Sequence, residues 1–367
     1  MPKPFALPAS DEAMMSTLSV LLLSGDSVTR HSSVATSLRK FTREEFDAFL
    51  ALAHRNHVVI RALDGFSDIM VAAQDDLRAD WAATAIVEER ARIAKATGFL
   101  RIICDAFDEE NLDLTVIKSL DHWPDFGSDI DLYTNTSPQA VSDLMHKRFG
   151  AHVESRSWGD RLASKWNFLI PGLPDPVEVH SGRLGQTGEQ LVLAAHLPDR
   201  SRQLEFEGQT FRVPSVSDRL MISTLQRMYR HFYFRLCDIV DSAQLADSGA
   251  IDYIELRSSA QAAGIWEGVA TYLVLVSDYV RRFRGAGLDL PAFVTQSARF
   301  AGDTMHFGAS FLRVQIMPQA VGLYRSQIAG LLRRRDLHSS ARLGLLPCLA
   351  TAAAIGYKIT GSDKGIW

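Results

Sequence analysis

The spacing of apolar and polar residues predicts helices in the first third of the chain. Thr42 and Glu45 have the spacing of a capping box, and apolar residues with a 3.6-residue period follow from Phe46 to Leu63. A second, longer amphipathic stretch covers residues 79–107. The pattern therefore predicts a largely helical N-terminal region.

The pattern changes after residue 111. Alternating apolar and polar positions predict strands over residues 112–117, 130–133, 151–157, 166–170 and 176–180, and a short strand or hairpin over residues 206–213. Ser137 followed by Pro138 predicts the start of a helix that continues to about residue 149. From Ser217 the chain is expected to be helical to its end, with breaks at Gly249, Gly264, residues 285–287 and Pro291.

These elements predict an α+β fold with a small mixed β-sheet between two helical regions. The expected regions are an N-terminal helical region at 1–111, an α/β core at 112–214, a helical domain at 215–290 and a C-terminal helical region at 291–367. Any chemistry is expected in the core.

Composition adds few constraints. Of the 367 residues, 47% are hydrophobic and 22% are charged, and the formal net charge is −4. These values are ordinary for a soluble globular protein. They provide no general attraction to nucleic acid or to an anionic membrane, so no stable nucleic-acid complex is expected.

Two apolar runs raise the question of membrane contact. Leu18 to Leu23 follows the acidic residues Asp11 and Glu12, where a signal peptide would carry positive charge, so a helix is expected there. Residues 343–357 are fewer than the roughly 20 that span a bilayer. A buried helix is expected for this segment, with a monotopic membrane contact as the alternative. We expect no transmembrane span and a cytoplasmic location.

The three cysteines, Cys104, Cys237 and Cys348, are far apart and form no C-x-x-C pattern. They are interpreted as small buried residues in a reducing compartment, and not as a disulfide framework or a zinc site.

Asp129 and Asp131 are the strongest candidates for chemistry. One apolar residue, Ile130, separates them on a predicted strand, so both carboxylates point to the same face. Two close carboxylates favour a divalent cation between them, and hard oxygen ligands favour Mg²⁺ or Mn²⁺. The alternative is a strand end with two solvated aspartates.

Three further residues extend this candidate site. Lys118 and Ser119 follow the first predicted strand, where a turn with a nearby cation suits a phosphate group. Glu178 lies on a later alternating strand, between Val177 and Val179. If sheet pairing brought Glu178 beside Asp129 and Asp131, three acids would complete a metal site.

This constellation resembles the nucleotidyltransferase superfamily related to DNA polymerase β. In that superfamily a strand and a Gly-Gly or Gly-Ser turn precede a D-x-D or D-x-E strand, and a third acid lies on a later strand. Here Ile117-Lys118-Ser119 is at the turn and Ser128 to Leu132 is at the acidic strand. The turn is similar to a group of uncharacterised bacterial nucleotidyltransferases with Lys-Gly in this place. Ser119 departs from that group's glycine.

The resemblance covers roughly residues 45–270. Its outer parts are Ala53 to His57, Val177 to His180 and Arg230 to Asp238. The similarity implies the same α/β core with flanking helices.

The resemblance also implies an activity. Asp129, Asp131 and Glu178 would hold Mg²⁺ or Mn²⁺ on a nucleoside triphosphate, with ATP the expected nucleotide, and Lys118 and Ser119 would contact phosphate. A nucleoside monophosphate would pass to an acceptor hydroxyl, with pyrophosphate as the leaving group. Glu178 is open to two roles, third metal ligand or general base.

Further residues are candidates for nucleotide contacts, but some of them can also be explained without a role in function. Ser128 adjoins the acidic strand, and Arg161 and Lys165 lie between two predicted strands, where a solvated loop is the alternative. His180 shares the face of Glu178 and is equally interpretable as a structural histidine.

The acceptor is left open among a small molecule, a glycan, a protein and an RNA. Two other functions compete with this one. The chain is alternatively a catalytically silent relative that binds nucleotide or acts as a scaffold, or a toxin-like enzyme that modifies tRNA or protein.

Overall fold

The computed structural model describes residues 11–24, 34–184, 189–301, 304–308, 310–314 and 319–360. The fold is mixed α+β, with helical regions that flank a sheet-containing core, as the sequence predicted. The region boundaries expected at residues 112, 215 and 291 stay predictions. A single cluster of buried hydrophobic side chains includes residues from both helical regions and from the sheet.

The N-terminal region consists of α1 (Asp11–Leu23), α3 (Arg43–Arg55), α4 (Val59–Ala72) and α5 (Asp76–Glu109). The capping box of Thr42 and Glu45 is confirmed at the start of α3. The apolar stripe after it belongs to two helices, because the chain turns at Asn56 and His57, and His57 has a φ of 54°.

The central sheet contains β1 (Thr115–Val116), β2 (Ile130–Thr134), β3 (His152–Val153), β4 (Lys165–Leu169) and β5 (Val177–Ser181). Its strand order is β1-β2-β5-β4-β3. β2 and β5 are parallel neighbours, and the other pairs are antiparallel. The first and third predicted strands are confirmed only as two-residue strands.

Helix α6 (Pro138–Phe149) follows β2 and has the predicted bounds. The Ser137 side chain caps it, with Pro138 in the first turn, and Gly150 ends it with a φ of 60°. The short helices α7 (Trp158–Leu162), α8 (Glu189–Ala195) and α9 (Leu197–Arg200) lie in the connections that follow. Residues 206–213 lie in a hairpin of β6 (Arg202–Phe206) and β7 (Gln209–Val213), which forms a separate two-stranded sheet.

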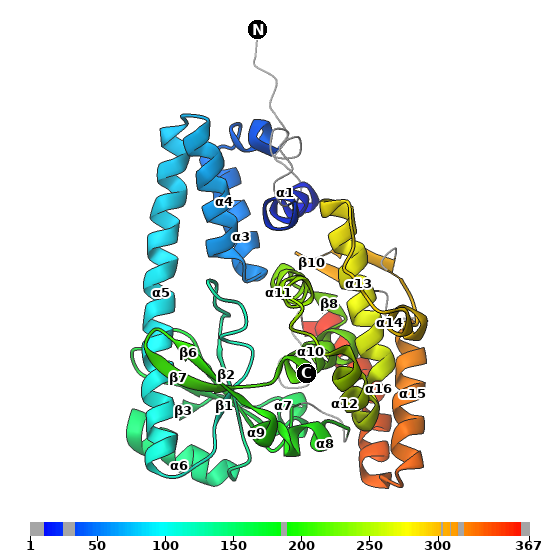
Figure 1. Ribbon diagram of the computed structural model, residues 1–367. Helices are drawn as coiled ribbons and strands as arrows, with labels where there is room; N and C mark the ends of the chain where they lie inside the picture. Colours follow the sequence, from blue (N-terminus) through cyan, green and yellow to red (C-terminus); the bar gives the residue numbers. More distant parts are fainter. Residues whose placement is uncertain are drawn as a thin grey trace.

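The C-terminal half contains α10 (Val216–Thr224), the π-helix η1 (Leu225–His231), α11 (Leu236–Asp247), α12 (Tyr253–Ala263), α13 (Trp266–Arg284), α14 (Ala292–Ser297), α15 (Gln319–Arg333) and α16 (Leu337–Thr360). Gly264 and Gly285 end α12 and α13 with positive φ angles, as the expected breaks require. In Figure 1 the long helix α5 runs along one side of the sheet, and α12 to α16 lie on the other side of the molecule.

The expectation that this half is helical to its end is wrong. Strands β8 (Tyr233–Phe234), β9 (Met305–Gly308) and β10 (Phe311–Val314) form a three-stranded sheet in the order β8-β10-β9. One residue, Phe232, separates β8 from the π-helix, and Tyr233 stacks on Phe311 with ring centroids 4.3 Å apart. A strand this short depends on pairing with a distant strand. Its two residues are too few to form an alternating pattern, so the sequence pattern did not predict it.

The apolar C-terminal segment also departs from expectation. Residues 343–357 are part of α16, but among the side chains described there Leu343 is buried and Leu345, Cys348 and Ile355 are exposed. A fully buried helix is therefore wrong for this segment. Among the described residues, no helix is long and apolar enough to cross a membrane.

The cysteine expectation holds in part. Cys237 is buried and Cys104 is half-buried, but Cys348 lies on the exposed surface of α16. All three are free thiols.

Candidate functional site

Asp131 and Glu178 lie directly opposite each other on the parallel strands β2 and β5. Both carboxylates are buried. Their flanking residues Leu132 and Val179 are fully buried on the other face of the sheet. The alternation that the sequence suggested therefore brings the two acids to one face, and the parallel register brings them together.

His180 joins this pair from the same strand as Glu178. Its Nε2 lies 2.7 Å from Glu178 Oε1. Ligand atoms of Asp131, Glu178 and His180 all lie within 4.8 Å of one another, which is the spacing of a potential metal site. The expectation that His180 shares the face of Glu178 is borne out by this contact.

Asp129 lies one residue before β2 begins and lines the same cavity. It is outside the compact group of Asp131, Glu178 and His180. Burial and the nearby carboxylate of Glu178 raise the pKa of Asp129.

Lys118 inserts its ammonium group into the acidic cluster. It forms a close ion pair with Asp131 and lies 3.8 Å from Glu178 Oε1. Its φ of 62° is a left-handed conformation that is costly for a residue with a side chain. This conformation directs the lysine side chain at the acids.

Ser119 has a structural contact. The backbone N–H of Asp131 donates a hydrogen bond to Ser119 Oγ over 2.8 Å, and the Ser119 side chain is buried. The hydroxyl thus ties the turn to the acidic strand.

A second lysine neutralises the cluster from β4. Lys165 Nζ lies 2.6 Å from Glu178 Oε2 and 3.5 Å from Asp160 Oδ1. Both carboxylate oxygens of Glu178 are therefore engaged, one by Lys165 and the other by His180.

The acids respond differently to this environment. Burial raises the pKa of Asp131, and the nearby carboxylate of Asp129 raises it further, against the effect of Lys118. Burial alone would raise the pKa of Glu178, but Lys118, His180 and Lys165 outweigh it and hold that pKa well below its usual range. Burial lowers the pKa of Lys118, whereas the surrounding carboxylates raise it above its ordinary value. Glu178 is thus held as a carboxylate and Lys118 as an ammonium ion.

The acidic cluster forms one wall of a cavity of about 180 Å³. A second part of the lining, the arginine wall, comes from α10, η1 and the N-cap of α11, and it contains Arg219, Arg227, Arg230 and Arg235. The Nε–H groups of Arg230 and Arg235 are buried and have no hydrogen-bond acceptor among the described residues. Buried guanidinium N–H groups without acceptors favour an anion in the cavity.

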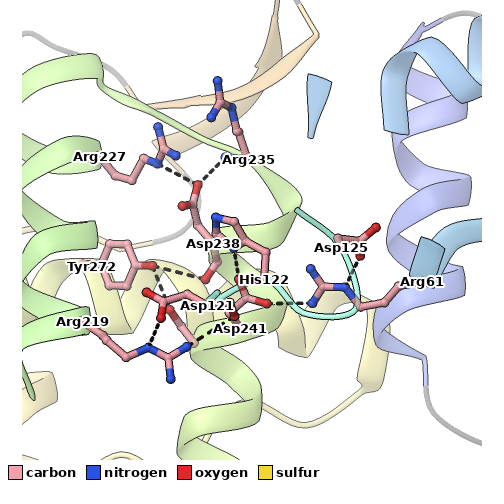
Figure 2. A network of polar contacts seen from close by, with 11 residues as sticks. Arg61, Asp121, His122, Asp125, Arg219, Arg227, Arg235, Asp238, Asp241 and Tyr272 are labelled. Carbon is pink, nitrogen blue, oxygen red and sulfur yellow. Dashed lines mark hydrogen bonds and ion pairs between the residues drawn. The ribbon is translucent and has the colours of Figure 1, made fainter. Parts of the chain in front are cut away.

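Two of these arginines are anchored by aspartates (Figure 2). Arg227 Nε lies 2.7 Å from Asp238 Oδ2, and Arg219 Nε lies 2.7 Å from Asp121 Oδ1. Asp238 also accepts a hydrogen bond from the backbone N–H of Arg235 at the start of α11. The π-helix η1 carries Arg227 and Arg230, and such helices are frequent at functional sites.

The structure does not bring every predicted residue to the cavity. Ser128 is exposed and does not line it. Arg161 is also exposed, and its guanidinium lies over the Trp158 ring at 5.6 Å from the centroid. The expectation that these two residues contact nucleotide receives no support, because Ser128 is exposed before β2 begins and Arg161 lies on α7 outside the cavity lining.

The sequence pattern did not lead to the arginine wall. Arg219, Ser223, Arg227 and Arg230 recur at spacings of three and four residues, which places them along one face of a helix. That periodicity of polar residues in an otherwise apolar helix is the signal that would have found them.

Comparison of the chain with protein-family models, with curated proteins and with solved structures gives no match.

Proposed function

We propose that this chain is a metal-dependent nucleotidyltransferase related to the DNA polymerase β-like superfamily. It moves a nucleoside monophosphate from a nucleoside triphosphate, with ATP expected, to an acceptor hydroxyl. The observation that supports the proposal is a single cavity lined both by the carboxylates of Asp131 and Glu178 and by Arg230 and Arg235, whose Nε–H groups are unpaired among the described residues. A metal-bound triphosphate has the two kinds of charge that these walls complement.

The donor set fits Mg²⁺ or Mn²⁺. Asp129, Asp131 and Glu178 offer hard carboxylate oxygens, and His180 adds an imidazole that Mn²⁺ accepts more readily than Mg²⁺. When bound, the metal ion would neutralise phosphate charge and help to orient the reacting α-phosphorus.

The remaining residues bind and orient. Arg230 and Arg235 donate to triphosphate oxygens, while His180 and Lys165 keep Glu178 ionised and fixed. During transfer the acceptor oxygen forms a bond to the α-phosphorus, and the bond from that phosphorus to the departing pyrophosphate breaks. The acceptor proton passes to Asp129, because its carboxylate lines the cavity and its pKa is raised by burial and by Glu178, whereas both Glu178 oxygens are already engaged.

One observation favours the catalytically silent alternative. The Lys118 ammonium lies against Asp131 and near Glu178, where a metal ion would lie in the active enzyme. A lysine that neutralises the acids permanently would leave a protein that binds nucleotide without transferring it.

The test incubates the purified chain with each α-³²P-labelled nucleoside triphosphate, Mg²⁺ or Mn²⁺, and fractions of a cell lysate. Transfer of label to an acceptor, lost in the Asp129→Asn/Asp131→Asn double variant, is the expected result. The matched control is Asp143→Asn, at an exposed position on α6, which should retain transfer.

Equilibrium binding of labelled ATP separates the two proposals. Metal-dependent binding without labelling of any fraction would favour the silent protein. If no triphosphate binds in the presence of either metal, both proposals are overturned.

A further inference from the structure

A second group of metal-ligating side chains lies beside the acidic cluster. Ligand atoms of His57, His122 and Cys237 all lie within 4.8 Å of one another. His57 and His122 also line the cavity, and their ring centroids are 5.9 Å apart. Two imidazoles and a thiol are a soft donor set, unlike the oxygen-rich group around Asp131.

The three residues come from three distant segments. His57 lies in the turn between α3 and α4, His122 in the connection between β1 and β2, and Cys237 in the first turn of α11. Nothing in their sequence spacing resembles a zinc motif.

Hydrogen bonds hold the first and third segments together. The backbone N–H of Cys237 donates to the Asn56 carbonyl over 3.2 Å, and the N–H of Leu236 donates to Asn56 Oδ1 over 3.1 Å. The Asn56 amide donates in turn to the carbonyls of Leu52 and Ser310. His57, with its left-handed φ of 54°, is therefore fixed next to Cys237 by a fully buried asparagine.

His122 is oriented by a carboxylate. Its Nδ1 forms a short hydrogen bond with Asp241 Oδ2, so Nε2 is the nitrogen left to act as a ligand. Asp241 is itself paired with Arg61, whose Nη1 lies 2.7 Å from Asp241 Oδ1, and Arg61 is held by Asp125 (Figure 2). A carboxylate behind a histidine is the usual support of a metal-bound imidazole.

We propose that His57, His122 and Cys237 bind one Zn²⁺ ion, with a fourth position open toward the cavity. Bonds of about 2.0 Å to nitrogen and about 2.3 Å to sulfur place tetrahedral ligands about 3.3–3.7 Å apart. Because the present ligand atoms lie within 4.8 Å of one another, they need to contract by at most about 1.5 Å to reach that geometry. The ion would tie together the α3–α4 turn, the loop before the acidic strand and α11, and so hold the two walls of the cavity in place.

The test uses Co²⁺ as a spectroscopic substitute for zinc. The reduced, chelator-treated full-length chain is titrated with Co²⁺, and a thiolate-to-cobalt absorption band that saturates at one ion per chain is expected. Cys237→Ser and His122→Gln should each abolish the band. Cys348→Ser, at an exposed cysteine on α16, is the matched control and should retain it.

A further variant tests the carboxylate that supports His122. Asp241→Asn should retain the band but weaken Co²⁺ and Zn²⁺ binding about 10–100-fold. Thermal unfolding of every variant without metal checks that the fold survives.

Absence of a thiolate band in the wild-type chain would overturn the proposal, even if Co²⁺ binds at the acidic cluster. Binding of Co²⁺ to Cys237→Ser with unchanged affinity and spectrum would overturn it as well. An unchanged band in the Asp129→Asn/Asp131→Asn variant is expected, because the zinc site does not depend on the proposed transferase activity.

Discussion

Lys118 forms a buried ion pair with Asp131 from a left-handed backbone conformation. The Lys118 ammonium also lies 3.8 Å from Glu178 Oε1, so it approaches two of the acids of the cluster. The charge of Lys118 stabilises the metal-free cluster, and the same charge competes with a metal ion for Asp131.

Replacement of Lys118 by methionine is expected to destabilise the metal-free protein by about 3–5 kcal/mol, the usual cost of leaving a buried charge unpaired. Methionine has a similar length and the same backbone preference, so the change reports the lost charge and not a change in strain. Urea unfolding at pH 7 in the presence of a chelator measures the effect.

Mg²⁺ should stabilise Lys118→Met more than the wild type, because the metal no longer competes with an ammonium group. The control is Lys147→Met, at an exposed position on α6, where a change of less than about 0.5 kcal/mol is expected. Equal losses in the two variants would show that Lys118 does not neutralise the cluster.

Arg230 offers a test of the anion-binding wall. Its Nε–H is buried at the cavity and lacks an acceptor among the described residues. Arg230→Ala should weaken ATP binding about 10–100-fold, because a hydrogen bond to a charged group contributes about 1.5–3 kcal/mol. Isothermal titration calorimetry with ATP and Mg²⁺ measures the difference.

Arg161→Ala is the matched control for this experiment. Arg161 was a candidate for the same role, but it is exposed and lies over Trp158. ATP affinity should be unchanged in this variant. A larger loss for Arg161→Ala than for Arg230→Ala would contradict the assignment of the wall.

Local parts of the fold could be predicted from the sequence. The Ser137-Pro138 start of α6 depends on residues that are neighbours in the chain. The shared face of Glu178 and His180 depends only on the two-residue period of a strand. These features follow from local backbone geometry, which a sequence pattern expresses directly.

Other parts could not be predicted because they depend on packing between distant segments. The alternation of β2 and β5 does not reveal that they are parallel neighbours, which is what brings Asp131 opposite Glu178. The approach of His57 to Cys237 requires the Asn56 contacts with α11, and no periodicity signals these contacts.

Ser119 illustrates how packing adds a role that the sequence does not reveal. The phosphate contact suggested by the turn stays a prediction, since Ser119 lines the cavity, and Ser119 Oγ also accepts the hydrogen bond from the Asp131 N–H. Ser119→Ala leaves that buried donor unpaired and should cost about 1–3 kcal/mol of unfolding free energy, measured with urea. Ser128→Ala, at an exposed serine close by, should be near neutral. Similar unfolding free energies for the two variants would show that the Ser119 hydroxyl does not stabilise the fold.

Asp218 provides a pH test that is independent of the proposed activity. Its side chain is buried in α10, and burial raises its pKa to about 6 despite Arg200, which lies 3.3 Å away. The unfolded chain has an aspartate pKa of about 3.9. Between these values the folded state holds the proton more strongly, so ionisation at rising pH costs stability.

The wild type should therefore lose stability relative to Asp218→Asn as the pH rises from about 4 to about 6. Asparagine keeps an acceptor for the Ser215 hydroxyl, which donates to Asp218 over 2.8 Å, but it cannot ionise. The measurement is the difference in unfolding free energy between the two proteins at several pH values. A difference that stays constant across this range would show that Asp218 ionises as readily in the folded protein as in the unfolded chain, and a difference that changes in favour of the wild type would show that it ionises more readily there.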